Sequence, residues 1–410
     1  MKFEEYRIAP GIKRNLVNLD FKRPTDIQYK AIPNILKGED VLAIAQTGTG
    51  KTAAFAIPVT HLIIERKRKS RVEGIRCLVM VPTRELATQI ATVFNQVSRG
   101  TGIEVLSLTG GVEQDPQISK LEKGVDILIA TPGRVFDLHS QGHLLLNRIE
   151  ILVLDEADHM LDLGFIKDIR DLIDRLPKNR QTLFFSATIN EEIKKLAYSM
   201  VRNAIRIQIS PDNKVSRNIS HSVAFIEMDD KRFFLERIVR ENPETKLLAF
   251  VRTKVRAERV CKALERMEID CLFIHGGMDQ KDRTKALSDF KRGVIKVLIA
   301  TDVSARGIDI PNVDIVVNYD LPEQAENYVH RVGRTGRGTQ KGKAIAFCST
   351  EEKVLLQEIE EYLGHPVNRV DIDKHTYLET VELTMDTDFD MNDLRKEMEV
   401  FENTKKKKKK

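Results

Sequence analysis

The chain has little that would stabilise it in an oxidising compartment or anchor it in a membrane. Its 410 residues contain no tryptophan, 6% aromatic residues and four cysteines. No apolar run reaches about 18 residues, the length that spans a bilayer, and MKFEEYRIAP has no apolar signal core. The cysteines show no CxxC and no paired spacing, which favours buried free thiols. They are Cys77, Cys261, Cys271 and Cys348. We therefore expect a soluble protein of the reducing cytoplasm.

Positive charge is scarcer than the total suggests. The formal net charge is +5, but the lysines at 405–410 supply +6, so the rest of the chain carries −1 (5 minus 6). Any contact with a polyanion must therefore come from a local surface. Residues 381–403 contain eight acidic residues and only Arg395 and Lys396 as basic ones. We predict a mobile tail over residues 386–410, whose lysines either contact phosphates or are simply solvated.

Short runs rich in Val, Ile and Leu alternate with amphipathic stretches of helical length. The first series lies at residues 41–46, 77–83, 126–132, 151–158 and 182–188. The second series lies at residues 246–251, 271–276, 296–302, 314–320 and 344–348. Nearly continuous apolar runs are typical of parallel strands that helices cover on both faces. The pattern predicts an α/β fold with two parallel sheets in tandem.

The polar stretch between the two series sets the expected domain limits. We predict a first domain over residues 1–209 and a linker over residues 210–218. A second domain should cover residues 219–370, and an extension should cover residues 371–410. The motifs described next fall just after the predicted strands, where open α/β sheets bind ligands.

One such motif is AQTGTGKT, which begins at Ala45. Gly48 and Gly50 would let backbone N–H groups approach a phosphate chain, Lys51 would reach its oxygens, and Thr52 would offer a hydroxyl to Mg²⁺. The strict phosphate-loop pattern starts with glycine, and here alanine takes that place. The alternative is a glycine-rich turn without a ligand, which the preceding apolar run and the helical pattern that follows disfavour.

The motif DEAD comes 104 residues after Lys51 (155 minus 51), at the end of an apolar run. Asp155 suits Mg²⁺, and Glu156 could orient or deprotonate an attacking water. The alternative is a helix N-cap with acidic residues in the first turn. His159 follows the motif, but no second His or Cys comes at metal-ligand spacing, so we predict a position on the helix surface.

A third motif, YVHRVGRTGR, ends at Arg337 and surrounds two glycines with cations. The potential phosphate-binding groups are His330 when protonated, Arg331, Arg334 and Arg337. Alone, this run would suggest a solvated basic loop. Downstream of a phosphate loop and an acidic pair, it predicts arginines that the second half supplies to a nucleotide.

Together these motifs resemble the DEAD-box ATP-dependent RNA helicases over about residues 1–370. The elements that follow in family order are FKRPTDIQ, AQTGTGKT, PTRELATQ, TGG, TPGR, DEAD, SAT, FVRTK, HGG with QKDR, ATDVSARGID and HRVGRTGR. The stretches GVDILIATPGRVFDLH and LDLGFIKDI, with the compact C-terminus, most resemble the bacterial RhlE branch. The resemblance implies two RecA-like domains, ATP with Mg²⁺, and RNA as the partner.

The resemblance also assigns roles at the nucleotide. Catalytic roles are expected for Lys51, Asp155, Glu156, Arg334 and Arg337. Nucleotide contacts are expected from Phe3, Gln28, Gln46, Thr47, Gly48, Thr49, Gly50, Lys51, Thr52 and Asp309, with Thr52 and Asp155 at the metal. The amide of Gln28 suits the edge of adenine, whereas Phe3 either stacks on that ring or anchors the core. The family usually has glycine where Asp20 stands, which puts the local turn in question.

A second set of residues is expected at the RNA. Contacts to its backbone are expected from Pro82, Thr83, Arg84, Gly110, Gly111, Thr131, Arg134, Gly276, Gln280, Arg283 and Thr301. Coupling between the nucleotide and the RNA is expected from Ser186, Thr188 and His330. His330 could equally be an ordinary residue of a helix surface.

The mechanism that these roles imply is an ATP-gated clamp. ATP and RNA together would favour closure of the two halves, and hydrolysis would reopen them. Gripping the sugar–phosphate backbone predicts weak sequence preference. We expect a helicase that opens short RNA duplexes or remodels RNA–protein complexes. The alternatives are an RNA clamp with little unwinding and a DNA translocase, and TPGR, SAT and HRVGRTGR argue against the latter.

Overall fold

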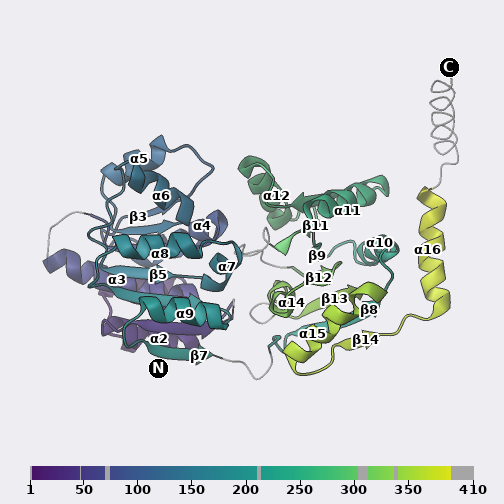
Figure 1. Cartoon of the computed structure of the whole chain (residues 1–410), viewed down its shortest axis with the longest axis horizontal. Helices are drawn as coiled ribbons and strands as arrows, with labels where there is room; N and C mark the ends of the chain where they lie inside the picture. The colour runs from purple at the N-terminus through teal and green to yellow at the C-terminus, as the bar shows by residue number, and fades with distance from the viewer. Residues whose placement is uncertain are drawn as a thin grey trace, which may run out of the picture. The chain divides into compact units, whose positions relative to one another are not determined.

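The structure, a computed structural model, describes residues 2–46, 48–69, 74–209, 214–302, 313–336 and 340–388. The described residues up to Ser216 form one compact unit, and those from Arg217 onward form a second. The colour bar of Figure 1 follows the chain through both units. The division falls within the polar stretch at 210–218, although the domain limits given above remain predictions.

The first unit is built on a seven-stranded parallel sheet with the order β3-β4-β2-β5-β6-β1-β7. Its strands are β1 (Val41–Ala45), β2 (Cys77–Met80), β3 (Val105–Leu108), β4 (Ile127–Ala130), β5 (Ile151–Leu154), β6 (Gln181–Ser186) and β7 (Ile205–Ile209). In the register of β1, Val41 aligns with Leu183 of β6 and with Ile205 of β7. All carboxyl ends of a parallel sheet lie at one edge, which is where the site forms.

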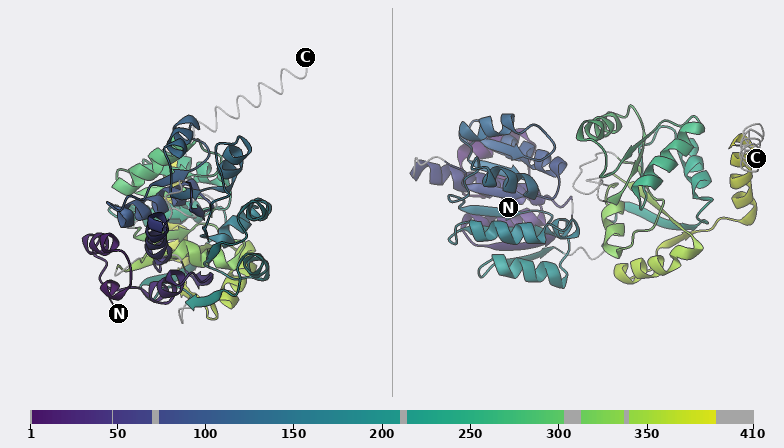
Figure 2. Two further views of the ribbon diagram at one scale, coloured as in Figure 1. Left: turned by 90° about the vertical axis from the view of Figure 1, so that its left-hand side faces the viewer. Right: turned by 45° about the horizontal axis from the view of Figure 1, so that its top comes forward.

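Helices cover both faces of this sheet (Figures 1 and 2). On one face η1 (Phe3–Glu5), α1 (Pro10–Asn18), α2 (Asp26–Leu36), α3 (Lys51–Lys69) and α4 (Arg84–Ser98) share a core with the strands. On the other face lie α6 (Pro132–Ser140), α7 (Ala157–Asp162), α8 (Ile166–Arg175) and α9 (Glu191–Met200), with α5 (Asp115–Glu122) beside β3. Val41 and Ala43 face the first core and Leu42 faces the second, so β1 is apolar at every position.

The second unit repeats this plan. Its seven-stranded parallel sheet has the order β10-β11-β9-β12-β13-β8-β14. The strands are β8 (Ile219–Phe225), β9 (Leu247–Phe250), β10 (Cys271–Ile274), β11 (Val297–Ala300), β12 (Ile315–Asn318), β13 (Gly342–Cys348) and β14 (Asn368–Val370). The helices are α10 (Lys231–Glu241), α11 (Lys254–Arg266), α12 (Gln280–Arg292), α14 (Ala325–Val332), η2 (Thr350–Glu352), α15 (Lys353–Leu363) and α16 (Lys374–Asp388). The predicted pair of parallel α/β sheets is confirmed.

The sequence predicted ten of these strands and missed four, namely β3, β7, β8 and β14. Three of the missed strands are sheet edges, and β8 is next to an edge. An edge strand has a neighbouring strand on one side only, so more of its surface is exposed to solvent. In β3 the burial alternates along the strand, and β14 is exposed throughout. Such strands lack the continuous apolar run on which the prediction rested.

Helix α16 packs on the second unit through α10. Tyr377 donates from its hydroxyl to Asp230 Oδ2 at 2.7 Å, and its ring lies 5.0 Å from that of Phe234. Arg237 Nη1 donates to Thr380 Oγ1 at 2.6 Å. The chain just after residue 370 therefore packs on the second unit. The predicted tail, residues 386–410, lies outside the described residues from 389 onward.

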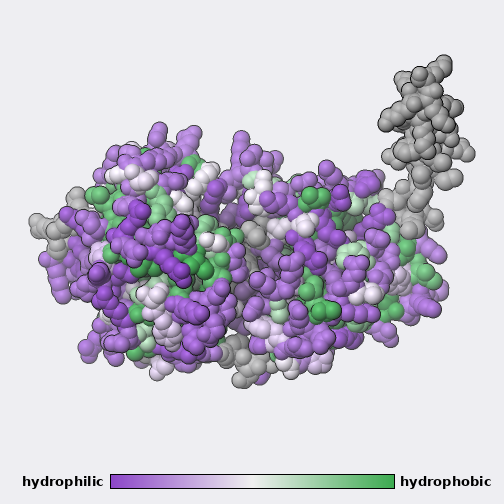
Figure 3. Space-filling model, in the orientation of Figure 1, coloured by the Kyte–Doolittle hydropathy of each residue, from purple (hydrophilic) through white to green (hydrophobic). Residues whose placement is uncertain are grey.

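The visible face of each unit is largely hydrophilic (Figure 3). Among the helices that the structure describes, none combines the length and the apolar content needed to cross a membrane. All four cysteines are free and buried, as the scattered spacing predicted.

Candidate active site and RNA interface

The candidate site of the first unit lies where its strands end. The strand order brings the predicted motifs into two neighbouring groups. TGG, TPGR and PTRELATQ follow β3, β4 and β2, whereas DEAD follows β5, SAT overlaps the end of β6, and AQTGTGKT overlaps the end of β1. The motifs with candidate RNA contacts are therefore adjacent, and so are those with candidate nucleotide contacts.

The loop after β1 keeps its lysine close to the strand. Lys51 begins α3, is only 6% exposed, and donates from Nζ to the carbonyl of Ala45 at 2.7 Å. Thr49 Oγ1 donates to the carbonyl of Gln46 at 2.7 Å and so closes the loop. Thr52 is the next residue of α3. This is the strand–loop–helix context that a phosphate loop requires.

Gln28 is hydrogen-bonded to this loop. Its Oε1 accepts from the backbone N–H of Thr25 at 3.0 Å, within the capping box of α2. Its Nε2 donates to the carbonyl of Gly50 at 3.1 Å. Gly50 has φ +89°, and a Cβ there would collide with the Gln28 amide, so this close approach requires glycine. An amide has a second N–H and a second lone pair, which suit the edge of a base.

Asp155 follows β5 as a buried carboxylate, 2% exposed. Burial raises its pKa to about 7; the nearby charges of Glu156 and Asp158 also raise it, and that of Lys51 lowers it. The Oδ1 atom accepts from the backbone N–H of Glu156 at 3.0 Å. A divalent cation beside this buried carboxyl group would favour its ionised form.

Asp158, the last residue of DEAD, was not among the predicted site residues, yet it joins two motifs. Its Oδ2 accepts from the backbone N–H of Ala187 at 3.1 Å, from that of Thr188 at 2.9 Å and from Thr188 Oγ1 at 3.0 Å. Ser186 is fully buried beside this contact. Sequence reasoning missed this role, because an acidic residue in the first turn of a helix is common without any such contact.

His159 corrects a prediction. We expected it on a helix surface, but it is only 4% exposed. Its Nδ1 lies 3.5 Å from Oε2 of Glu156, one turn back along α7. Glu156 itself caps α7 with a left-handed backbone (φ +52°, ψ 48°), a conformation that non-glycine residues adopt at a cost and mostly at functional sites.

The candidate RNA residues of the first unit gather around one loop. Arg134 is 8% exposed, and its Nη2 donates to the carbonyl of Val112 at 3.0 Å. The guanidinium of Arg84 lies where a Cβ on Gly111 would be, so that position also requires glycine. Thr83 caps α4 by accepting from Leu86. The motifs PTRELATQ, TGG and TPGR therefore meet, with Gly110 in the loop, Pro82 at its β2 side and Thr131 capping α6.

In the second unit, the corresponding candidates lie at the ends of β10 and β11. Gly276 is exposed just after β10, and Gln280 begins α12. Thr301 follows β11, and its N–H donates to the carbonyl of Ile274 at 3.3 Å, which brings the two strand ends together. Arg283 lies one turn further along α12 and is 9% exposed.

Within HRVGRTGR, the prediction that Arg331 binds phosphate is wrong. This side chain is 2% exposed and is bound inside the unit by both oxygens of Asp302, at 2.6 and 2.7 Å, and by Asn318 and Asp320. It is a structural clamp and not a phosphate-binding cation. Arg334 is 4% exposed, and its Nε donates to the carbonyl of His330 at 3.3 Å.

Three predicted residues, Thr47, Asp309 and Arg337, lie outside the described residues.

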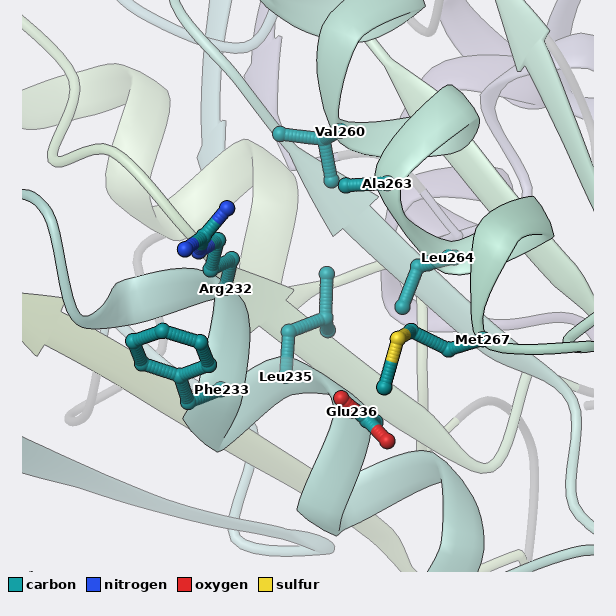
Figure 4. Close-up of a pocket in the computed structure, with 8 residues that line it drawn as sticks. All are labelled: Arg232, Phe233, Leu235, Glu236, Val260, Ala263, Leu264 and Met267. Carbon is teal, nitrogen blue, oxygen red and sulfur yellow. The ribbon is translucent and has the colours of Figure 1, made fainter. Parts of the chain in front are cut away.

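A separate small pocket opens between α10 and α11 of the second unit and is lined by Phe233, Leu235, Val260, Leu264 and Met267 among others (Figure 4). It encloses about 10 Å³, roughly the room that one water molecule needs. It is too small for a nucleotide and plays no part in the candidate site.

Comparison with known proteins identifies the family. Residues 25–196 match the DEAD/DEAH box helicase family, and residues 230–339 match the helicase conserved C-terminal domain. ATP-dependent RNA helicase DbpA of Bacillus subtilis is 40% identical over 370 residues, which cover 90% of this chain and 76% of that protein. RhlB of Shewanella amazonensis is 40% identical over 378 residues, 91% of this chain and 86% of that one. The chain belongs to the DEAD-box RNA helicases.

Solved structures of other proteins are similar to this helicase. Dbp5 of S. cerevisiae bound to RNA and ADP–BeF3 gives a TM-score of 0.81 at 29% identity over 94% of this chain and 99% of that one. Mss116p bound to single-stranded RNA and AMP-PNP gives 0.82 at 29% identity over 92% and 81%. The expectation of an RNA-dependent ATPase with two RecA-like units is confirmed.

Phe3 of the helicase lies in the core, which favours the second of its two predicted roles. The side chain is 4% exposed. Its ring centroid lies 5.7 Å from that of Phe21, edge to face, and 6.0 Å from that of Tyr6. The ring is packed as a core anchor would be, but Phe3 also lines a pocket with Leu16 and Phe21, so its contact with adenine stays a prediction.

Asp20 settles the question about the turn before FKRPTDIQ. It has φ +57°, the left-handed conformation that glycine adopts without strain. Aspartate is among the few other residues that tolerate this conformation. The turn that the family usually makes with glycine is therefore kept in this helicase.

Proposed function

We propose that the ends of β5, β6 and β1 hold Mg–ATP in this helicase. The backbone of the loop at Gly48 and Gly50 would surround the phosphates, and Lys51 would leave the carbonyl of Ala45 to reach the β- and γ-oxygens. Gln46, Thr47 and Thr49 would complete this loop. The remaining hydrogen-bonding capacity of Gln28 would recognise adenine, so the same amide would connect the base to the phosphate loop.

Thr52 and Asp155 are our candidates for holding Mg²⁺. In the described part of the chain, no group of three or more His, Cys, Asp or Glu side chains is placed to bind a metal ion. That fits Mg²⁺, which proteins usually bind with one or two carboxylates while phosphates and water complete the coordination. Bound there, Mg²⁺ would neutralise charge on the phosphates. The raised pKa of Asp155 supports this assignment.

Glu156 is our candidate for the residue that orients the attacking water. It follows the proposed metal ligand directly, and it is the N-cap of α7 with a left-handed backbone. The link from Asp158 to Thr188 would carry changes at the nucleotide to SAT, which supports the coupling role proposed for Ser186 and Thr188. His330 of the second unit remains a candidate for the same coupling.

RNA would be bound through its backbone at the ends of β3, β4 and β2. Arg84 and Arg134 would present guanidinium groups beside the bare backbone of the loop at Gly110 and Gly111. Pro82, Thr83 and Thr131 would line the same surface. Gly276, Gln280, Arg283 and Thr301 would extend it in the second unit.

The second unit would also act on the nucleotide. Arg334 and Arg337 would stabilise charge on the γ-phosphate in the transition state, and Asp309 would accept from the ribose hydroxyls. ATP and RNA would favour a closed state and hydrolysis would reopen it. This cycle would drive either the opening of RNA duplexes or an RNA clamp with little unwinding. A strand-displacement assay distinguishes these two activities.

We also propose the RhlE branch for this helicase, on the strength of the stretches GVDILIATPGRVFDLH and LDLGFIKDI. Relatives named DbpA and RhlB are each 40% identical to this chain. They show the family, whereas the assignment to the RhlE branch is our proposal. The four buried free thiols support action in the cytoplasm, where thiols stay reduced.

The observation that carries the proposal is that Asp155 directly follows β5 and Lys51 begins α3 after β1, close enough for the charge of Lys51 to lower the pKa of the Asp155 carboxyl. Glu156→Gln should keep Mg–ATP affinity, because Lys51 and Asp155 remain. RNA-stimulated hydrolysis should fall by about 10²–10⁴, the usual contribution of a positioned general base. The complex with ATP and RNA should then become long-lived. Glu122→Gln, an exposed change at the end of α5, serves as the control. Hydrolysis by Glu156→Gln at the parent rate would remove Glu156 from this role.

A further inference from the structure

His159 carries an unexplained cost in this structure. Its imidazole is buried, and neither Nδ1 nor Nε2 has a hydrogen-bond partner among the described residues. A buried polar group without a partner destabilises a protein by about 1–3 kcal/mol. Such groups are few in folded proteins, and those that occur call for a specific explanation.

The position of His159 on α7 supplies one. Glu156 is the N-cap of α7, and His159 is the third helical residue after it. Side chains three residues apart lie on one face, and a third-position side chain commonly reaches back to the cap. The Nδ1 atom of His159 is 3.5 Å from Oε2 of Glu156, just beyond hydrogen-bond length. A small rotation of either side chain would close this gap.

We infer that His159 is a positioning residue that donates from Nδ1 to Glu156 Oε2 and so fixes the carboxylate that orients the attacking water. The inference rests on the proposed role of Glu156. Hydrogen bonds of catalytic groups are often long without substrate and shorten in the reacting complex. The carboxylate of Glu156 is 12% exposed, and a fixed donor at Nδ1 would restrict its orientation.

The experiment compares His159→Leu with His159→Asn in the full chain. Leucine fills the buried space without a donor, whereas the asparagine amide places an N–H close to the position of Nδ1. His159→Leu should lower kcat of the RNA-stimulated ATPase by about three- to tenfold, the loss expected for one hydrogen bond. Its affinity for Mg–ATP, measured by fluorescence of a labelled nucleotide, should stay within about twofold of the parent. His159→Asn should recover most of kcat.

A double-mutant cycle with Glu156→Gln separates positioning from simple packing. If His159 acts through Glu156, adding His159→Leu to Glu156→Gln should lower the residual rate no further. Urea unfolding of each variant shows whether the chain remains folded. Full activity in His159→Leu, equal loss in His159→Asn, or independent effects in the double variant would overturn the inference and leave the proposed function standing. A parent rate in Glu156→Gln would instead overturn both.

Discussion

The two units of this helicase have the same strand order, and yet we propose a phosphate-binding loop in only the first. Numbered from the first strand of each unit, both sheets run 3-4-2-5-6-1-7. After the first strand, the chain enters a glycine-rich loop in one unit and the stretch IEMDD in the other. The sheet therefore provides the position for a ligand, and the loop decides whether one can bind.

A lysine begins the helix after this strand in both units. In the first unit, Lys51 is bonded to a backbone carbonyl that it can leave. In the second unit, Lys231 is 0% exposed and bound by the carboxylate of Glu352, with Asp320 3.9 Å away. Asp320 follows β12 as Asp155 follows β5. Carboxylates of the chain itself thus occupy the surroundings where the first unit would place phosphate oxygens.

The difference teaches that one arrangement of lysine and aspartate can serve either ligand binding or stability. In the first unit, burial raises the pKa of Asp155 to about 7, although the charge of Lys51 lowers it. In the second unit, Arg252 and Arg256 also reach the buried acids, so the charges are balanced internally. The same substitution at the two lysines should therefore have opposite consequences.

The largest expected effect is on the stability of the second unit. Lys231→Met leaves Glu352 and Asp320 buried with one cation fewer, which typically costs about 3–5 kcal/mol. Hydrogen exchange of β12 and β13, followed by mass spectrometry, should show faster opening. Lys231→Met combined with Glu352→Gln should lose less, because the amide still accepts from the N–H of Leu321. Equal protection in Lys231→Met and the parent would mean that this buried network is not what stabilises the unit.

The sequence singled out Lys51 in a phosphate-loop pattern, whereas no local pattern pointed to Lys231. A phosphate loop is a local pattern, whereas Lys231 is bonded to a residue 121 positions away. Arg331 was misassigned for a related reason, since its partner Asp302 lies 29 positions earlier. Buried strands and glycine loops follow from local chemistry. The pairing of buried charges depends on tertiary neighbours, and so does the burial of His159.

Lys51→Met tests the nucleotide-binding role that we propose for the lysine of the first unit. RNA-stimulated hydrolysis should fall by about 10²–10³, as for the loss of one cation that stabilises the transferring phosphoryl group. The first unit should lose only about 0.5–1.5 kcal/mol, the contribution of the bond to Ala45. Steady-state kinetics and hydrogen exchange of β1 measure the two effects. A large loss of protection with unchanged turnover would give Lys51 the structural role that we assign to Lys231.

The pKa of Asp155 predicts a pH dependence of the stability of the first unit. Because the folded pKa lies near 7, above its usual value of 3.8, the folded state binds this proton more tightly than the unfolded chain. The contribution of Asp155 to stability should therefore decrease as pH rises from about 4 to about 7, and stay constant above that. The change should be a few kcal/mol at most.

Asp155→Asn removes this titration. Without nucleotide, the variant should be more stable than the parent at pH 8, and the two should converge towards pH 4. Urea unfolding at a series of pH values measures the difference, in which the other titrating groups cancel. A parent–variant difference that is constant across this range would contradict the raised pKa.

The smallest effect concerns Gln28, which contacts the loop that only the first unit has. Its amide connects Thr25 to Gly50, and we propose that it also contacts adenine. Gln28→Ala should cost about 1–3 kcal/mol, because it leaves polar partners unpaired. If the amide recognises the base, the cost should fall on ATP and not on GTP, so the ratio of their kcat/KM values should shrink. If Gln28 only supports the loop, the kcat/KM values for both nucleotides should fall equally and their ratio should not change.

Gln28→Glu sharpens the test, because Oε1 can still accept from Thr25 while the N–H donor to Gly50 is lost. A GTP to ATP ratio that matches the parent in both variants would leave Gln28 as a support of the phosphate loop alone.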